Sequence, residues 1–221
     1  DKSFFRQVVP MISEIKENVG KPYYGTLITL TNHTPWREAS IYSDYDITIN
    51  VDGISSNYLE NSVIGRYIKS VNYMDQAINE FIELMDAEGL LDNTVIIIYG
   101  DHDARLGYSQ FNYMYNYDPV LGRVKTIEDE GYVPFNEYDY ELSKKVPFII
   151  WSKDMEKGTV IDKPMGMIDV MPTLGNMLNI YNKYALGKDI INVKKEDCIV
   201  PFKDGSYITD KIYYSAKNSE S

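Results

Sequence analysis

The chain has 221 residues, of which 44% are hydrophobic, and its formal net charge is −11. The acidic balance and the lack of a Lys/Arg cluster argue against a nucleic-acid partner, because such proteins must neutralise phosphates. The single cysteine, Cys198, excludes an internal disulfide, and the length favours one domain over residues 1–221.

The first part of the chain predicts a helix and then a buried strand. Apolar residues on one face indicate a helix from Ser3 that ends at Gly20. The β-branched run Tyr23–Thr31 predicts a strand, which is followed by Asn-His-Thr-Pro-Trp at residues 32–36. His33 therefore lies just beyond a predicted strand, as an ordinary loop histidine or as part of a site.

A polar segment and the longest helix come next. Residues 41–56 are turn-rich and predict a surface loop or a short strand. From Ile64 to Met85 apolar residues recur every three or four positions until Gly89, which predicts a helix of several turns. A helix between two strands predicts a right-handed crossover packed on the sheet.

The run from Thr94 to Tyr99 predicts a central strand with a polar cluster at its end. Its apolar residues are consecutive, which favours a strand covered on both faces, as in a parallel sheet. Asp101 and His102 follow, at the strand end where open α/β sheets bind ligands. A carboxylate beside an imidazole suits Mn²⁺, Mg²⁺ or Zn²⁺.

The remaining chain predicts a long irregular stretch, a third strand, a helix and a small β element. Residues 108–141 have no clean period and predict short elements or a lid over the site. Val146–Trp151 reads as a strand, and residues 162–180 read as a loop and a helix with Asp169 as N-cap. Residues 200–214 predict short strands about an Asp-Gly turn.

These elements predict an α/β fold with three α/β/α layers and a mostly parallel central sheet, over about residues 1–180. A small antiparallel β subregion is expected at residues 181–221. Tyr23–Thr31, Thr94–Tyr99 and Val146–Trp151 should be near neighbours in the sheet, which brings their carboxyl-end loops to one edge.

Four motifs, in this order along the chain, resemble one family. They are Asn-His-Thr-Pro-Trp at 32–36, Gly-Asp-His at 100–102, Asp-Val-Met-Pro-Thr-Leu at 169–174, and Val-Pro-Phe with Asp-Gly-Ser-Tyr-Ile-Thr at 200–209. Together they resemble the extracellular domain of lipoteichoic acid synthases, in the sulfatase and alkaline-phosphatase superfamily. The likeness corresponds to the later part of that catalytic domain, so the N-terminal part of a sulfatase-like fold is expected to be missing.

The resemblance implies a phosphoglycerol transferase held in the cell membrane by upstream transmembrane helices, with its catalytic domain on the extracellular face. Such an enzyme moves glycerol phosphate from phosphatidylglycerol to a growing lipoteichoic acid polymer through a threonine-linked intermediate, with Mn²⁺, or alternatively Mg²⁺ or Zn²⁺, as cofactor. Asp101 and His102 match two metal ligands, and His33 matches the histidine at the substrate phosphoryl group. The threonine nucleophile and a further carboxylate are expected upstream of Asp1, so the fragment alone is expected to be inactive.

The residues leave several alternatives open. Arg105 either binds a phosphate bidentately or pairs with Asp103 or another local acid. The imidazole of His33 either donates to a phosphoryl oxygen or protonates the leaving glycerol. The same fold would also suit a sulfatase, a phosphodiesterase, a phosphoethanolamine transferase, or a cell-surface binding module without catalysis.

Overall fold

The computed structural model describes residues 1–37, 43–51 and 53–218. The chain forms two compact units, Asp1–Met155 (unit 1) and Glu156–Ser221 (unit 2). The single domain predicted over residues 1–221 stays a prediction. Within the described ranges, no helix combines the length and the apolar composition that crossing a bilayer requires.

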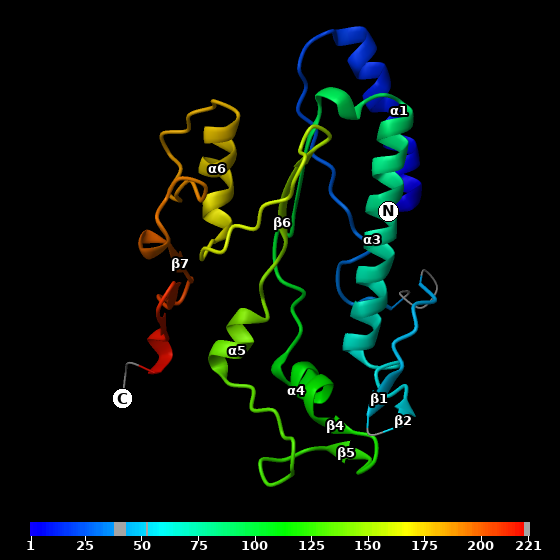
Figure 1. Ribbon diagram of the computed structural model, residues 1–221, viewed down its shortest axis with the longest axis vertical. Coiled ribbons are helices and arrows are strands. Elements are labelled where there is room, and N and C mark those ends of the chain that lie inside the picture. The colour runs from blue at the N-terminus through cyan, green and yellow to red at the C-terminus, as the bar shows by residue number, and fades with distance from the viewer. Residues whose placement is uncertain (38–42, 52, 219–221) are drawn as a thin grey trace. The chain divides into compact units, whose positions relative to one another are not determined.

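Two long helices lie side by side in unit 1, α1 (Lys2–Val19) and α3 (Val63–Ala87) (Figure 1). Gly20 ends α1 in the left-handed conformation, with φ 59°, as the sequence predicts. Ser62 begins α3, because its side chain accepts a hydrogen bond from the Gly65 N–H. The end of α1 and the start of α3 therefore follow from local signals, whereas α1 begins at Lys2 without a side-chain cap, so that Ser3, the predicted start, lies inside its first turn.

One of the two hydrophobic clusters described in unit 1 lies between these helices and the adjoining strands. The rings of Phe5 and Phe81 are 4.8 Å apart at their centres and join α1 to α3. The side chains of Ile96 and Trp151 pack against the same core. Its buried members are Phe5, Val9, Ala77, Phe81, Met85, Leu90 and Leu91.

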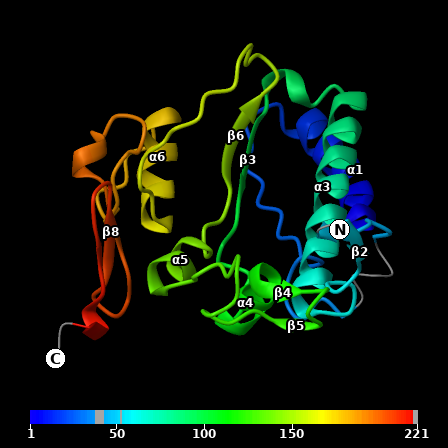
Figure 2. The ribbon, with the colours of Figure 1, turned by 60° about the horizontal axis from the view of Figure 1, so that its bottom comes forward.

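The two predicted strands Thr94–Tyr99 and Val146–Trp151 pair with each other, as β3 (Val95–Tyr99) and β6 (Phe148–Ser152) (Figure 2). They run antiparallel, with Ile96 opposite Trp151. The parallel pairing predicted for them is therefore wrong. A continuous apolar run indicates that a strand is buried, but it does not indicate whether the strand runs parallel or antiparallel to its neighbour. The chain between β3 and β6 makes no crossover of the kind that a parallel pair requires.

Among the residues that the structure describes, the predicted strand Tyr23–Thr31 pairs with no other segment in a strand ladder, so the prediction of a third neighbouring strand is also wrong. The backbone N–H groups of Leu30 and Thr31 donate instead to the carboxylate of Asp1, at 3.1 and 3.0 Å. Ile28 and Leu30 are exposed. A β-branched run without a partner strand thus stays extended but unpaired.

The shorter elements of unit 1 lie around these central ones. Part of the polar segment 41–56 forms a hairpin of two strands about Gly53, whose φ is 81°, while residues 41, 42 and 52 lie outside the described ranges. The long stretch 108–141 contains two helices and a second hairpin, as predicted. The bounds are β1 Ile49–Val51, β2 Ile54–Ser56, η1 Leu91–Asn93, α4 Tyr108–Asn116, β4 Tyr117–Asp118, β5 Arg123–Val124 and α5 Glu137–Leu142.

Unit 2 contains one α-helix and a three-stranded antiparallel sheet, which confirms the small C-terminal β element. Asp169 precedes the helix but does not cap it through its side chain. Its buried carboxylate accepts from the backbone N–H groups of Gly166 and Lys188, at 2.9 and 2.8 Å. The bounds are η2 Met167–Asp169, α6 Val170–Met177, η3 Lys195–Asp197, β7 Ile199–Pro201, β8 Tyr207–Thr209, β9 Tyr213–Tyr214 and η4 Ala216–Asn218.

The contact between α1 and α3 predicts a large effect of one substitution. Phe81→Ala should lower the free energy of unfolding by about 3–5 kcal/mol, because it leaves a cavity against Phe5. Val71→Ala is the matched control, since Val71 is an exposed residue of the same helix. Urea unfolding followed by circular dichroism measures both, and equal midpoints for the two variants would contradict this packing.

Candidate functional site

The candidate site begins where β3 ends, at Gly100. A side chain at this position would meet Val146, because a Cβ would lie 2.8 Å from the Val146 Cβ. The Gly100 N–H donates to the carbonyl oxygen of Pro147 at 3.2 Å. Glycine is therefore required for the close approach of the two chain segments, and this approach fixes the point from which Asp101 and His102 leave the strand pair.

His102 presents one ring nitrogen to the site. Its Nδ1 lies 2.7 Å from the carbonyl oxygen of Asp103, so Nδ1–H donates and Nε2 is the ring nitrogen that faces the site. That Nε2 is 3.8 Å from Oδ1 of Asp101, whose side chain is 83% exposed, against 33% for His102. A backbone carbonyl that fixes the tautomer of a histidine is typical of metal-ligating histidines.

His33 reaches the same place from the turn at residues 31–36. The centres of the His33 and His102 rings are 5.6 Å apart, with the planes at 87°. Nδ1 of His33 lies 2.7 Å from the Thr34 carbonyl oxygen, so this ring is also fixed with its Nε2 as the available nitrogen. Within the part of the chain that the structure describes, neither Nε2 has a hydrogen-bond partner. The structure therefore brings together the three residues that the sequence singled out.

The turn that carries His33 is held by side chains that the sequence reasoning missed. Ser70 of α3, which is 1% exposed, places its hydroxyl 3.0 Å from the carbonyl oxygen of Thr31 and 3.0 Å from Oδ1 of Asn32. The indole N–H of Trp36 donates to the Asn32 carbonyl oxygen at 2.9 Å. A small polar residue on the apolar face of a helix was the available signal for Ser70, because such a residue needs a partner when buried.

Trp36 joins this turn to α3 a second time. Its ring is 5.2 Å from that of Tyr67, centre to centre. Burial raises the pKa of the Tyr67 hydroxyl, and the negative charge of Asp103 raises it further. Tyr67 therefore stays protonated near neutral pH. The first half of α3 is thus packed against the loop that carries His33.

Arg105 is close in sequence to this cluster but forms none of its side-chain contacts. Its backbone N–H donates to Oδ2 of Asp103 at 2.7 Å, and its φ is 54°. Among the described residues the guanidinium has no ion pair, so the predicted alternative of a salt bridge to Asp103 is not formed. The exposed guanidinium is available to an anion, and its predicted role in substrate binding stays a prediction.

The donors fit part of a metal site. Asp101 offers a carboxylate and His102 an imidazole nitrogen, which are the donor types that Mn²⁺ and Zn²⁺ accept. However, across residues 1–37, 43–51 and 53–218 no three or more His, Cys, Asp and Glu side chains are grouped so as to hold an ion. Since these metals take four to six donors, the described residues could supply only part of the ligand set of such an ion.

Comparison with known proteins gives one matching family and several relatives. The family model for Sulfatase matches residues 1–180. Lipoteichoic acid synthase 2 of Bacillus subtilis (strain 168) is 29% identical over 228 residues, and lipoteichoic acid synthase of Staphylococcus aureus (strain USA300) is 33% identical. Each comparison covers 100% of this chain and 31% of the relative. The chain therefore spans about a third of the length of these curated relatives.

Two solved structures have a similar fold. The lipoteichoic acid synthase LtaP from Listeria monocytogenes has a TM-score of 0.72 at 24% identity, covering 98% of this chain and 49% of that chain. A protein of the alkaline phosphatase superfamily from Vibrio parahaemolyticus has a TM-score of 0.59 at 18% identity, covering 95% of this chain and 42% of that chain. These likenesses confirm the α/β, sulfatase-like fold class predicted from the sequence.

The support of the His33 turn by α3 can be tested by removing one oxygen atom. Ser70→Ala should lower the free energy of unfolding by about 1–3 kcal/mol, because it leaves the Thr31 carbonyl without its buried partner. It should also broaden or shift the ¹⁵N resonances of the His33 ring. Ser109→Ala, an exposed serine of α4, is the control and should change neither. Unchanged His33 resonances in Ser70→Ala would contradict the proposed support.

Proposed function

Because the chain belongs to the sulfatase family, we propose that it is part of a metal-dependent phosphotransferase that moves glycerol phosphate from phosphatidylglycerol to a growing lipoteichoic acid polymer. The observation that carries the proposal is that His102 lies between the ring of His33 and the carboxylate of Asp101, with no hydrogen-bond partner on either histidine Nε2 among the described residues. The similarity of the entire chain to lipoteichoic acid synthases supports the choice of substrate. The catalytic domain would face the cell exterior, and transmembrane helices outside these residues would anchor it.

Asp101 and His102 would hold the metal. Mn²⁺ is the proposed ion, with Mg²⁺ or Zn²⁺ as alternatives, and when bound it neutralises charge on the phosphoryl oxygens and lowers the pKa of the nucleophile. The exposed carboxylate of Asp101 is free to turn towards a cation, while the Nδ1 hydrogen bond already fixes the ring of His102. Because the ring of His102 is already held in place, it would lose little conformational entropy when a metal ion binds.

His33 would act on the phosphoryl group. In the proposed first step the oxygen of a threonine outside these residues attacks phosphorus, and the bond from phosphorus to the diacylglycerol oxygen breaks. The Nε2 of His33 either donates to a phosphoryl oxygen or supplies the proton that the leaving oxygen needs. Its position 5.6 Å from the ring of His102 keeps it beside the metal-binding pair while its own Nε2 stays available for a substrate.

The metal-binding role predicts the effect of two polar substitutions in the full-length enzyme. Asp101→Asn and His102→Gln should each lower phosphatidylglycerol turnover by about a hundredfold or more, since the charge stabilisation at stake is several kcal/mol. Asp154→Asn is the control, because Asp154 is an exposed carboxylate beyond the end of β6. A fluorescent phosphatidylglycerol assay measures the loss, with a sulfate ester and phosphatidylethanolamine as competing substrates. Normal turnover by the double variant would contradict the assignment of Asp101 and His102 as metal ligands. Faster turnover of a competing substrate than of phosphatidylglycerol would indicate that the enzyme has another activity of the sulfatase family.

The small number of donors predicts weak metal binding by the 221-residue chain alone. Isothermal titration with Mn²⁺ should give a dissociation constant at least about a hundredfold higher than for the full-length protein, because removing ligands lowers affinity. His102→Gln should abolish the remaining heat, whereas Ser109→Ala should preserve it. Tight binding of one ion by the short chain would show that all the ligands lie within it.

A further inference from the structure

A second surface of the molecule, in unit 2, has the composition of a lipid-binding site. Residues 170–188 contain no Asp or Glu and two lysines, Lys183 and Lys188, although the whole chain has a net charge of −11. The rest of unit 2 is not basic, because Glu156–Ser221 contains nine lysines and nine acidic residues in all. The lack of acidic residues is therefore a local feature of this segment, which comprises α6 and the loop after it.

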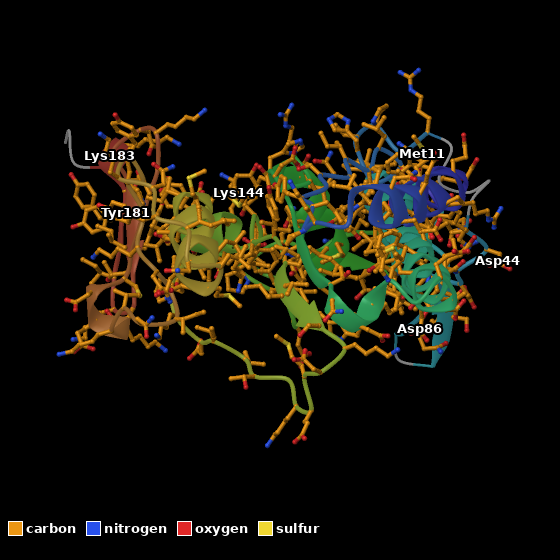
Figure 3. The ribbon with its side chains drawn as sticks, turned by 90° about the horizontal axis from the view of Figure 1, so that it is seen from above. Met11, Asp44, Asp86, Lys144, Tyr181 and Lys183 are labelled. Carbon is orange, nitrogen blue, oxygen red and sulfur yellow. The ribbon has the colours of Figure 1, made fainter. Side chains whose placement is uncertain are left out.

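This segment surrounds a hollow of about 430 Å³. Three asparagines, Asn176, Asn179 and Asn182, contribute amide groups to its lining, and Met171 and Ile180 contribute apolar groups. Tyr181 and Lys183 also line it, and Figure 3 labels both of them in unit 2. The hollow therefore combines a cation and several hydrogen-bonding amides with apolar surface.

The loop holds these side chains outward through its own hydrogen bonds. The Ile180 N–H donates to the Gly175 carbonyl oxygen at 2.7 Å, and a Cβ at Gly175 would lie 2.5 Å from the Ile180 carbonyl oxygen. The Tyr184 N–H donates to Oδ1 of Asn182 at 2.9 Å. The loop is thus fastened tightly to α6, and its outward-facing residues are presented by a defined backbone.

The outward-facing residues are of the types found at membrane surfaces. Tyr181 and Leu186 are each 90% exposed, and Tyr184 is 78% exposed. Tyrosine is favoured where one end of a ring is apolar and the other is wet, as at the boundary between lipid headgroups and acyl chains. The Nζ of Lys183 lies 4.9 Å from the centre of the Tyr184 ring and, among the described residues, has no carboxylate partner. An anionic group can therefore reach it without displacing an existing ion pair.

We propose that the hollow formed by residues 170–188 binds the phosphate and hydroxyl groups of an anionic phospholipid headgroup at a bilayer surface. Lys183 would contact the phosphate, the amides of Asn176 and Asn179 would bind headgroup hydroxyls, and the exposed tyrosines and Leu186 would enter the interface. The choice of a lipid bilayer over a soluble anion follows from the exposed apolar and aromatic residues beside the only unpaired cation described at the hollow. The biological role of this binding site rests on the proposed function, in which the enzyme uses a membrane lipid as its substrate. The binding itself requires no catalysis.

Sedimentation of the 221-residue chain with vesicles tests the proposal. Binding should be at least tenfold stronger to vesicles of phosphatidylcholine with about 30% phosphatidylglycerol than to vesicles of phosphatidylcholine alone. The reason is that vesicles without an anionic lipid lack the contacts between the hollow and an anionic headgroup. Lys183→Gln should weaken binding by about fivefold, the effect of one cation at an anionic surface. Tyr181→Ser combined with Tyr184→Ser should weaken it to a similar extent, through lost burial at the interface. Lys211→Gln, an exposed lysine of unit 2 outside the segment, should have no such effect.

Three outcomes would overturn the proposal. They are equal binding to both kinds of vesicle, equal binding by Lys183→Gln and Lys211→Gln, and displacement from vesicles by micromolar glycerol phosphate, which would show a site for a soluble anion. Asp101→Asn should retain vesicle binding, because Asp101 lies outside the segment. If the full-length enzyme failed to turn over phosphatidylglycerol while the vesicle results held, the proposed function would fail and this binding site would stand.

Discussion

The packing of α3 against two partners is the constraint on which the candidate site depends. Towards its C-terminal end α3 buries Phe81 against Phe5 of α1, and in its first half Ser70 and Tyr67 hold the turn that carries His33. The apolar contact supplies more of the stabilisation than the Ser70 hydroxyl, because a single hydrogen bond contributes only about 1 kcal/mol net. The role of the buried hydroxyl is to position the turn that carries His33. The helix α3 thus connects the packed core to the surface turn that carries His33.

The second loop of the site obtains its position differently. Asp101 and His102 follow Gly100 at the end of β3, and the close approach of Gly100 to Val146 leaves no room for a larger residue where the loop departs. In both loops a histidine donates its Nδ1 proton to a nearby backbone carbonyl, so that the two Nε2 atoms are available together. Such an arrangement costs little on binding a cation or a phosphoryl group, because the tautomers are already set.

Local patterns in the sequence predicted more than the pairing of distant segments. The spacing of apolar residues gave the helix ended by Gly89, and the Asp-Gly turn gave the hairpin of β7 and β8, because both depend on contacts between near neighbours. The direction of β6 and the unpaired state of residues 23–31 depend on which chain segments meet, which an apolar run does not encode. The site residues themselves were predictable because polar groups after strands are conspicuous, whereas Ser70 looked like an ordinary helix residue.

Pulsed electron paramagnetic resonance of the Mn²⁺-loaded full-length enzyme tests the proposed roles of Asp101 and His102 as metal ligands and of His33 as a substrate-binding residue. We expect a nitrogen coupling from one directly bound imidazole, which disappears in His102→Gln and persists in His33→Gln. Loss of the coupling in His33→Gln but not in His102→Gln would reverse the two roles. A spectrum without any imidazole coupling would contradict the account.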